Sequence, residues 1–183
     1  MDPNKLVFEA QLSEAKGEEE GVAASRGTGA GRRVVVKFLQ RTYGADAHNA
    51  AAAVGVAPVL RDHVFLGSGA NHWQMVVMDY VNGQTIDKAS VAQSVAQTAR
   101  AAVDALHGEG FVHGDLRGCN IIHSGESGVR IVDFDWAGPV SSATYPTLMN
   151  HADIAWPEGV RAGQQITVAT DKATLETLAL ALV

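Results

Sequence analysis

Short apolar runs separated by polar or glycine-rich breaks make up the first half of the chain. Four of these runs alternate loosely or are rich in β-branched residues, and each predicts a strand. The predicted strands are residues 5–12, 32–40, 59–67 and 72–81. Residues 42–55 are rich in alanine and end in Gly55, with Pro58 just beyond, which predicts a helix. This order predicts an antiparallel sheet that carries one helix, with a long loop at residues 13–31 inside its first hairpin.

The second half of the chain has a different pattern. Residues 88–107 place apolar side chains three and four positions apart, which predicts a long amphipathic helix, and residues 170–183 predict another helix. The apolar runs at residues 111–123 and 129–138 are too short for helices and carry acidic residues. The change of pattern near residues 82–87 predicts a boundary between a strand-rich and a helix-rich part. The two predicted parts are residues 1–83 and residues 84–183.

Composition and charge narrow the class of protein. The 183 residues suit one domain or two small lobes, and an apolar fraction of 46% is enough for a core. The net charge of -6 includes no basic block, which argues against nucleic acid as a partner. The chain has one cysteine, no leader-like N-terminus and no apolar run long enough for a membrane helix. These features predict an intracellular, cytoplasmic protein without a membrane partner.

The motif HGDLRGCN, residues 113–120, places charged and polar side chains between two apolar segments. Asp115 and Asn120 lie five positions apart, and Asp133 follows a later short strand. Their oxygens are the hard ligands that Mg²⁺ prefers, and a carboxylate beside a metal can orient or deprotonate a hydroxyl. Lys37 lies within the apolar strand VVVKFL, where a lysine either reaches solvent or points at an anion. A lysine, metal ligands and a base are the groups that phosphoryl transfer requires.

In order and spacing, these motifs resemble those of the protein-kinase superfamily over roughly residues 5–183. HGDLRGCN is similar to the catalytic-loop pattern H-R-D-L-x-x-x-N, and VDFD at residues 132–135 looks like the metal-binding D-F-G. VVVKF at residues 34–38 resembles the strand V-A-I-K, and MVVMDYVNG at residues 75–83 resembles the hinge between the kinase lobes. The segments YPTLMN and IAWPEGV are similar to short, atypical kinase-like domains found in fungi.

The resemblance implies a role for each matching residue around the phosphates. Asp115 would accept the proton of the acceptor hydroxyl or align the acceptor. Arg117 matches a position where many kinases carry a lysine toward the γ-phosphate. Asn120 and Asp133 would bind Mg²⁺, and Lys37 would reach the α- and β-phosphates of ATP.

The resemblance also implies an adenine pocket and a support for the catalytic loop. Asp79 and Val81 would meet adenine through their backbone groups, Met78 would be the gatekeeper, and Ile122 would form the floor of the pocket. The residues implied to support the catalytic loop are His113 and Asp171.

Several departures from the kinase pattern bear on activity. No G-x-G-x-x-G precedes the lysine strand, and the GTGAG stretch at residues 27–31 lies inside the predicted hairpin loop. The predicted helix after that strand offers only Asp46 and His48 where kinases carry a glutamate that pairs with the lysine. Gly114 replaces the arginine that pairs with a phosphorylated activation loop. No A-P-E pattern follows, and the chain ends within the helix of Asp171, which predicts a fold truncated or minimal at both ends.

The resulting hypothesis is an α+β protein with a two-lobed, protein-kinase-like fold. It binds ATP and Mg²⁺ and transfers the γ-phosphoryl group to a hydroxyl acceptor, which is a protein serine or threonine or, as in aminoglycoside and choline kinases, a small molecule. Two alternatives stay open. One is a pseudokinase, a binding module without turnover, which the missing glycine loop and helix glutamate favour. The other is a metal-dependent hydrolase built on Asp115 and Asp133, which leaves the lysine strand unexplained.

Overall fold

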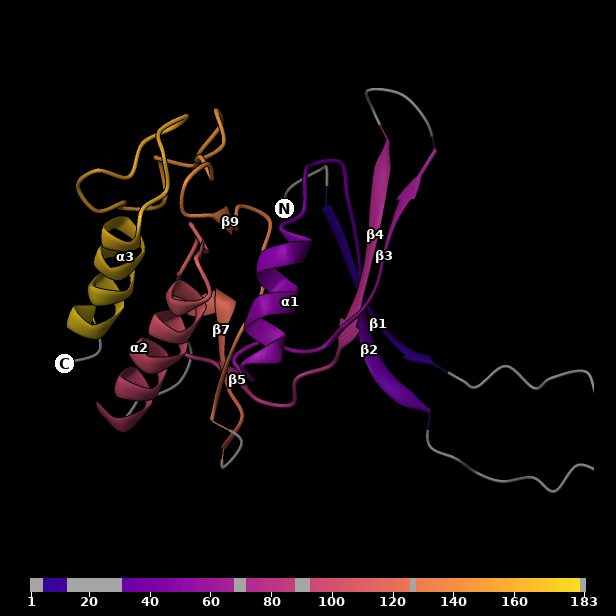
Figure 1. The fold of residues 1–183 in the computed structure, drawn as a ribbon. Coiled ribbons are helices and arrows are strands. Elements are labelled where there is room, and N and C mark those ends of the chain that lie inside the picture. Colours follow the sequence, from indigo (N-terminus) through magenta and orange to yellow (C-terminus); the bar gives the residue numbers. More distant parts are fainter. Residues whose placement is uncertain (1–4, 13–30, 68–71, 88–92, 126–127, 182–183) are drawn as a thin grey trace, which may run out of the picture.

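The structure is a computed structural model of the chain, and it describes residues 5–12, 31–67, 72–87, 93–125 and 128–181. In these residues the fold is mixed α+β, with antiparallel sheets and three α-helices, which confirms the predicted class (Figure 1). The helices are α1 (Ala45–Ala53), α2 (Gln93–Gly108) and α3 (Val168–Ala181), with a 3-10 turn η1 (Gly118–Asn120). The strands are β1 (Lys5–Leu12), β2 (Arg32–Leu39), β3 (Leu60–Leu66), β4 (Trp73–Asp79), β5 (Gln84–Thr85), β6 (Phe111–Val112), β7 (Ile121–His123), β8 (Val129–Ile131) and β9 (Gly138–Pro139).

The predicted hairpin and four-stranded sheet are confirmed. β1 to β4 form one antiparallel sheet in the order β1-β2-β4-β3, so β1 is an edge strand of the described sheet. Lys5 pairs with Leu39 and Val7 pairs with Lys37. Because side chains alternate along a strand and paired residues share a face, Lys5, Val7 and Lys37 lie on the same face of the sheet. The loop predicted at residues 13–31, apart from Gly31, lies outside the described residues.

α1 lies between the four-stranded sheet and the C-terminal half of the chain (Figure 1). Its predicted C-terminal glycine is confirmed, since Gly55 has a φ of 78°, a left-handed conformation that glycine adopts without strain. The helix begins at Ala45, later than predicted. The preceding residue, Gly44, donates its N–H to the carbonyl of Phe134 at 3.0 Å, which ties the start of α1 to the VDFD segment.

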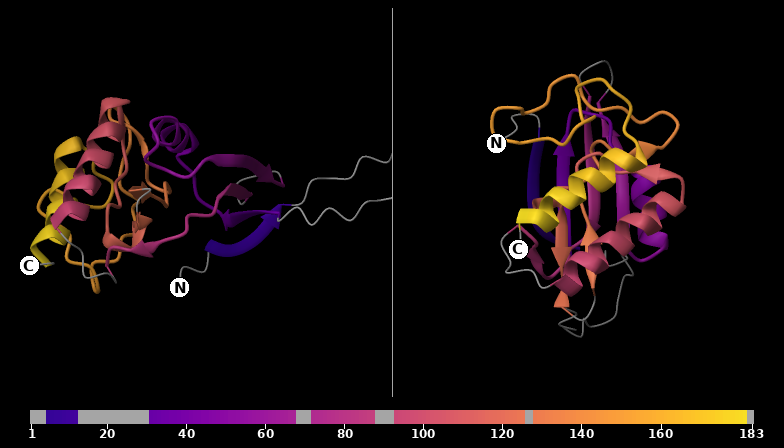
Figure 2. Two further views of the ribbon diagram at one scale, coloured as in Figure 1. Left: turned by 90° about the horizontal axis from the view of Figure 1, so that it is seen from below. Right: turned by 90° about the vertical axis from the view of Figure 1, so that its left-hand side faces the viewer.

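The C-terminal half contains the two remaining helices and the short strands. α2 and α3 lie side by side, on the far side of the molecule from the four-stranded sheet (Figures 1 and 2). The predicted helix at residues 88–107 is confirmed from Gln93 onward, because residues 88–92 lie outside the described part. α3 begins at Val168, where Thr167 Oγ1 caps it by accepting the N–H of Thr170 at 3.1 Å. None of the described helices is long and apolar enough to cross a membrane.

The short apolar runs form small antiparallel sheets, in the orders β5-β7-β8 and β6-β9. The short strand predicted before Asp133 is confirmed as β8. Between β9 and α3 the chain has little regular structure, and a second apolar cluster holds it. Tyr145 and Ile166 are buried in this cluster, and Trp136 and Trp156 pack against it.

Phe134 connects the core to the polar segment around it. Its ring is fully buried in the main apolar core. His48 of α1 stacks on Phe134 with ring centroids 4.6 Å apart and planes 3° apart, and His113 meets the same ring edge-on at 5.0 Å. Phe134, which lies between Asp133 and Asp135 in the chain, is thus held from two sides, by α1 and by the HGD loop.

His48 is fully buried, and both of its ring nitrogens have partners. Nε2 lies 2.8 Å from the carbonyl oxygen of Pro58, and Nδ1 lies 2.7 Å from the hydroxyl of Tyr43. A neutral ring satisfies both contacts, since Nε2–H donates to the carbonyl and Nδ1 accepts from the hydroxyl. Burial, together with the nearby positive charge of Lys37, lowers the pKa of His48 to about 4.

The buried neutral imidazole predicts a loss of stability in mild acid. The unfolded chain protonates His48 near its ordinary pKa of 6.5, whereas the folded chain does so only near 4. The neutral His48 therefore contributes its full stabilisation of the fold above pH 6.5, and this contribution is lost as the pH falls toward 4. From this residue we expect the free energy of unfolding to fall by about 2 kcal/mol between pH 7 and pH 5, measured by urea denaturation.

Two variants isolate this contribution. His48→Asn should remove that part of the pH dependence, whereas His151→Asn, which changes an exposed histidine, should keep it. The same pH dependence in His48→Asn and in the parent protein would contradict a buried neutral His48.

Candidate functional site

A cavity of about 350 Å³ opens between the four-stranded sheet and the short strands of the C-terminal half. It gathers residues from distant parts of the chain, of which Lys37 and Asp133 are 96 positions apart. All seven residues predicted to bind nucleotide or metal line it: Lys37, Met78, Asp79, Val81, Asn120, Ile122 and Asp133. The structure therefore brings together these two predicted groups of residues in one place.

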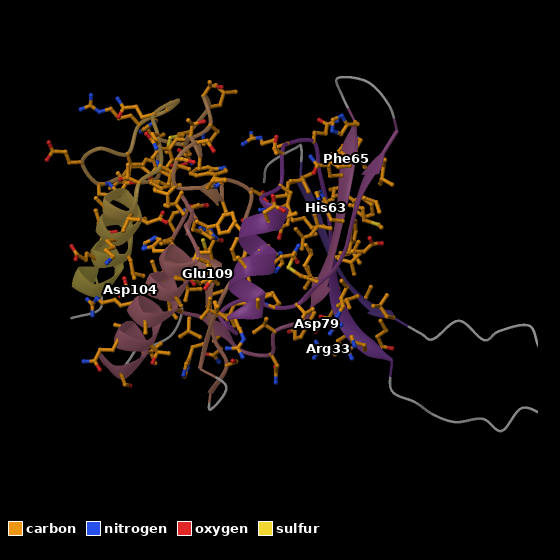
Figure 3. All side chains as sticks on the ribbon, viewed as in Figure 1. Arg33, His63, Phe65, Asp79, Asp104 and Glu109 are labelled. Atoms are coloured by element: carbon orange, nitrogen blue, oxygen red, sulfur yellow. The ribbon has the colours of Figure 1, made fainter. Side chains whose placement is uncertain are left out.

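The cavity has an apolar end. Val35 and Met78 lie opposite each other on β2 and β4, and Ile122 and Val132 line the cavity with them. Asp79 stands at this end, where β4 finishes (Figure 3).

The carboxylate of Asp79 is hydrogen-bonded to arginines of the neighbouring strands. It accepts two hydrogen bonds from Arg61, at 2.7 and 2.6 Å, and one from Arg32 at 3.3 Å. The bond from Arg61 holds the pKa of Asp79 below its usual range, so the carboxylate stays charged. The side chain is thus occupied by arginines, and the backbone N–H of Asp79 donates to the carbonyl of Val59 at 3.0 Å. A ligand would therefore meet the backbone carbonyl of Asp79.

Two lysines and two aspartates meet at the other end of the cavity, and we call these four residues the lysine–aspartate cluster. Lys37 Nζ lies 2.5 Å from Asp133 Oδ1 and also contacts Asp135 Oδ1. Lys5 Nζ lies 2.7 and 2.6 Å from the two carboxylate oxygens of Asp133 and 3.3 Å from Asp135 Oδ2. Each aspartate therefore faces both ammonium groups.

The two carboxylates respond differently to this environment. Burial alone would raise the pKa of Asp133, but the charges of Lys37 and Lys5 outweigh it and hold the pKa well below its usual range. For Asp135, burial and the adjacent charge of Asp133 raise the pKa. Of the two carboxylates, Asp133 is therefore the one that stays ionised to lower pH.

Asp133 also has an unusual backbone conformation. Its φ is 71°, and it is the one non-glycine residue with positive φ in the described part of the chain. Non-glycine residues in such conformations concentrate at functional sites, where the surrounding structure holds them. Here the stacked ring of Phe134 and the two lysines provide that hold.

The predicted base, Asp115, lies beside Asn120. The Asn120 amide nitrogen donates to the backbone carbonyl and to Oδ2 of Asp115, both at 2.9 Å. Arg117 donates two further bonds to the same carboxylate, Nε to Oδ1 at 2.5 Å and an Nη to Oδ2 at 2.8 Å. In this structure Arg117 therefore neutralises Asp115, and its guanidinium also lies 5.7 Å from the ring centre of Trp156.

Of the two predicted support residues, Asp171 holds the HGD loop from α3, and His113 belongs to that loop. The fully buried carboxylate of Asp171 accepts the backbone N–H groups of His113 and Gly114, at 2.7 and 2.8 Å, and lies 3.0 Å from Nε2 of His107. His113 Nε2 lies 3.1 Å from the carbonyl oxygen of Val132, one residue before Asp133. This chain of contacts joins α3, the HGD loop and the VDFD segment.

The glycine at position 114 has a local structural reason. Its φ is 83°, and a Cβ there would come within 2.6 Å of Cδ1 of Ile166 and 3.2 Å of Cβ of Trp136. An arginine, as in H-R-D, does not suit this backbone. The departure from the kinase pattern therefore goes with the conformation of this loop.

The partners of Lys37 in the structure do not come from α1. Asp46 is exposed on α1, and His48 of the same helix is neutral and bonded elsewhere. Lys37 pairs instead with Asp133 and Asp135, so it is firmly held without a helix carboxylate.

Lys5 is the site residue that the sequence pattern did not reveal. It begins a loosely alternating strand, where a lysine is ordinary, and its partner Asp133 lies 128 positions away. The available signal was the hairpin, because pairing of residues 5–12 with residues 32–40 can put Lys5 on the face of Lys37. The register that does so depends on the intervening loop, which the sequence does not specify.

The cavity offers two oxygen ligands for a metal ion. The amide nitrogen of Asn120 is used by Asp115, which leaves Oδ1 as its ligand atom, and Asp133 offers its carboxylate. The described residues contain no group of three or more His, Cys, Asp or Glu that could hold a metal ion. Two oxygens fit Mg²⁺, which takes its other ligands from phosphates and water. Because both Asp133 oxygens are bonded to Lys5, a metal there has to displace that ammonium.

Comparisons with protein-family models and with curated proteins identify no relative of the chain. The chain matches no protein-family model, and no curated protein is significantly similar to it. Inference about function therefore starts from the motifs and from the geometry of the cavity.

We expect Asp171→Asn to destabilise the protein by about 2–4 kcal/mol in urea unfolding. An amide has one acceptor oxygen, so the variant leaves one of the two buried N–H groups of His113 and Gly114 unpaired. The matched control is Asp104→Asn on the surface of α2, where an exposed carboxylate meets Lys172 at 2.8 Å (Figure 3). The control should change stability by less than about 0.5 kcal/mol. Equal effects of the two variants would show that Asp171 does not anchor the loop.

Proposed function

We propose that the protein binds ATP with Mg²⁺ and transfers the γ-phosphoryl group to a hydroxyl acceptor. The arrangement proposed is kinase-like and two-lobed, with residues 1–83 and 84–183 on either side of the nucleotide. The observation that carries the proposal is the single cavity, which joins an apolar end beside Met78 to a charged end at Lys37 and Asp133. A nucleotide has the same division, since its base is flat and largely apolar and its phosphates are anionic.

Each end of the cavity suits one part of ATP. Val35, Met78 and Ile122 offer apolar surface to adenine. The backbone carbonyl of Asp79 and the backbone of Val81 would meet the edge of the base, since the N–H of Asp79 is bonded to Val59. Lys37, whose side chain is only 3% exposed, would bind the phosphates. Asn120 and Asp133 would hold Mg²⁺, which when bound supplies positive charge to the β- and γ-phosphates.

Asp115 would orient the acceptor hydroxyl or take its proton. It is next to the proposed metal ligand Asn120, through contacts of 2.9 Å, which keeps the acceptor close to the phosphates. Arg117 would then leave Asp115 or stay beside it as a partner for the γ-phosphate. The acceptor in this proposal is a protein serine or threonine, and a small-molecule hydroxyl is the alternative.

The second candidate function is a pseudokinase, and one observation favours it. Both aspartates that would act in catalysis are neutralised by internal cations, Asp115 by Arg117 and Asp133 by Lys5 and Lys37. A site whose ionic partners are already satisfied can remain a binding surface without turnover.

Nucleotide binding should depend on both the metal and Asp133. At an ATP concentration about tenfold above Kd, binding should stabilise the protein by about 1.4 kcal/mol, or roughly 3–6 °C in Tm. We expect this shift with Mg²⁺ and a much smaller one in EDTA. Asp133→Asn should lose the difference between the two buffers, whereas Asp153→Asn, which changes an exposed aspartate, should keep it. Equal shifts in Mg²⁺ and EDTA for the parent protein would contradict the metal site.

Turnover separates the two candidate functions. Asp115→Asn should leave the ATP-induced shift nearly unchanged and lower phosphoryl transfer by about 10²–10⁴-fold, because the group that positions the hydroxyl is lost. The measurement is transfer of radiolabelled γ-phosphate to a panel of peptides and aminoglycosides. If the parent protein labels nothing above the level of Asp115→Asn but still binds ATP, the pseudokinase is the better assignment.

A further inference from the structure

Lys5 adds a second ammonium group to the charged end of the cavity. β1 pairs with β2 so that Lys5, Val7 and Lys37 share one face, and all three line the cavity. The two lysines therefore reach the same aspartates from neighbouring strands. Of these two lysines, the proposed function assigns phosphate binding to Lys37 alone.

Lys5 and Lys37 are held to different degrees. The Lys37 side chain is 3% exposed, whereas that of Lys5 is 26% exposed and extends from an edge strand of the described sheet. A lysine ammonium on its flexible four-carbon stem can change partners by rotating. Lys5 is therefore the ammonium that can leave the cluster while Lys37 stays.

The charges of the lysine–aspartate cluster cancel only when Lys5 is present. Asp133 and Asp135 as carboxylates supply two negative charges, and Lys37 alone supplies one positive charge. Lys5 brings the sum to zero, and its contacts of 2.7 and 2.6 Å occupy both oxygens of Asp133. Although burial would lower the pKa of Lys5, the charges of Asp133 and Asp135 raise it, so the ammonium stays protonated.

We propose that Lys5 is an exchangeable cation of this site. In the free protein it holds Asp133, and when Asp133 takes a divalent ion, Lys5 turns to the phosphates of the bound nucleotide. The proposal rests on the proposed function for the identity of the ligand. It gives the charged end two phosphate-binding ammonium groups, and it makes Lys5 a competitor of the metal for Asp133.

Removal of Lys5 should therefore move two affinities in opposite directions. In Lys5→Met, which keeps the length of the side chain, Mn²⁺ alone should bind roughly tenfold more tightly or better, because a competing charge at about 3 Å is gone. The same variant should bind ATP in EDTA roughly ten- to a hundredfold more weakly, because a charged donor to the phosphates is lost. Paramagnetic resonance of free Mn²⁺ measures the first affinity, and titration calorimetry with ATP in EDTA and in Mg²⁺ measures the second.

Two further variants serve as controls. Lys172→Met removes the same charge from an exposed lysine that pairs with Asp104, away from the cavity, and should change neither affinity. Lys5→Arg keeps the charge and should bind ATP in EDTA about as well as the parent protein. If Lys5→Met does not fold, as judged by circular dichroism, Lys5→Gln takes its place.

The outcomes separate this proposal from the proposed function. If the parent protein binds ATP with Mg²⁺ and Lys5→Met leaves either affinity unchanged, the exchange is refuted while nucleotide binding stands. A parent protein that binds no ATP in either buffer overturns both. Opposite changes in the two affinities, absent in Lys172→Met, are the result expected of an exchangeable cation.

Discussion

The lysine–aspartate cluster is the interaction on which the rest of the site depends. It joins β2, through Lys37, to the segment of Asp133 and Asp135 in the C-terminal half, and the cavity forms beside that junction. Charges removed from water destabilise a fold unless they are paired closely and in balance. The contacts of Lys5 and Lys37 with both carboxylates meet that condition, so the sheet is fixed in place by the same groups that would bind a ligand.

Buried aromatic contacts and hydrogen bonds keep the cluster in position. Phe134 lies between the two aspartates along the chain, and its buried ring is stacked on His48 and touched edge-on by His113. His113 is in turn fixed by Asp171, so α1 and α3 both restrain the VDFD segment. The positive φ of Asp133 can persist because its neighbours on both sides are anchored in this way.

The sequence predicted those parts of the fold whose causes are local. Alternation predicted the strands and helical spacing predicted α2, because burial of one face imposes a period on the residues of each element. The alanine content of α1, with Gly55 and Pro58 beyond it, predicted that helix. The motifs also predicted seven of the residues that line the cavity, since their spacing follows from the strands that carry them. The partner of Lys37 could not be found in this way. It depends on how the VDFD segment meets the sheet, which is a contact between distant parts of the chain, whereas Asp46 on the nearest helix faces solvent.

The pairing of Asp133 and Asp135 with Lys5 and Lys37 constrains what the charged end of the cavity can bind. A ligand that reaches the charged end separates some of the lysines from the aspartates. It then has to supply new charged partners to those side chains, since an unpaired buried charge destabilises the complex. A neutral molecule can fill only the apolar end beside Met78. A nucleotide with a divalent ion can do more, because the ion compensates Asp133 and the phosphates compensate the lysines that are released. The proposed choice of Mg-ATP thus follows from charge balance as well as from the motifs, and it holds for a binding module as well as for an enzyme.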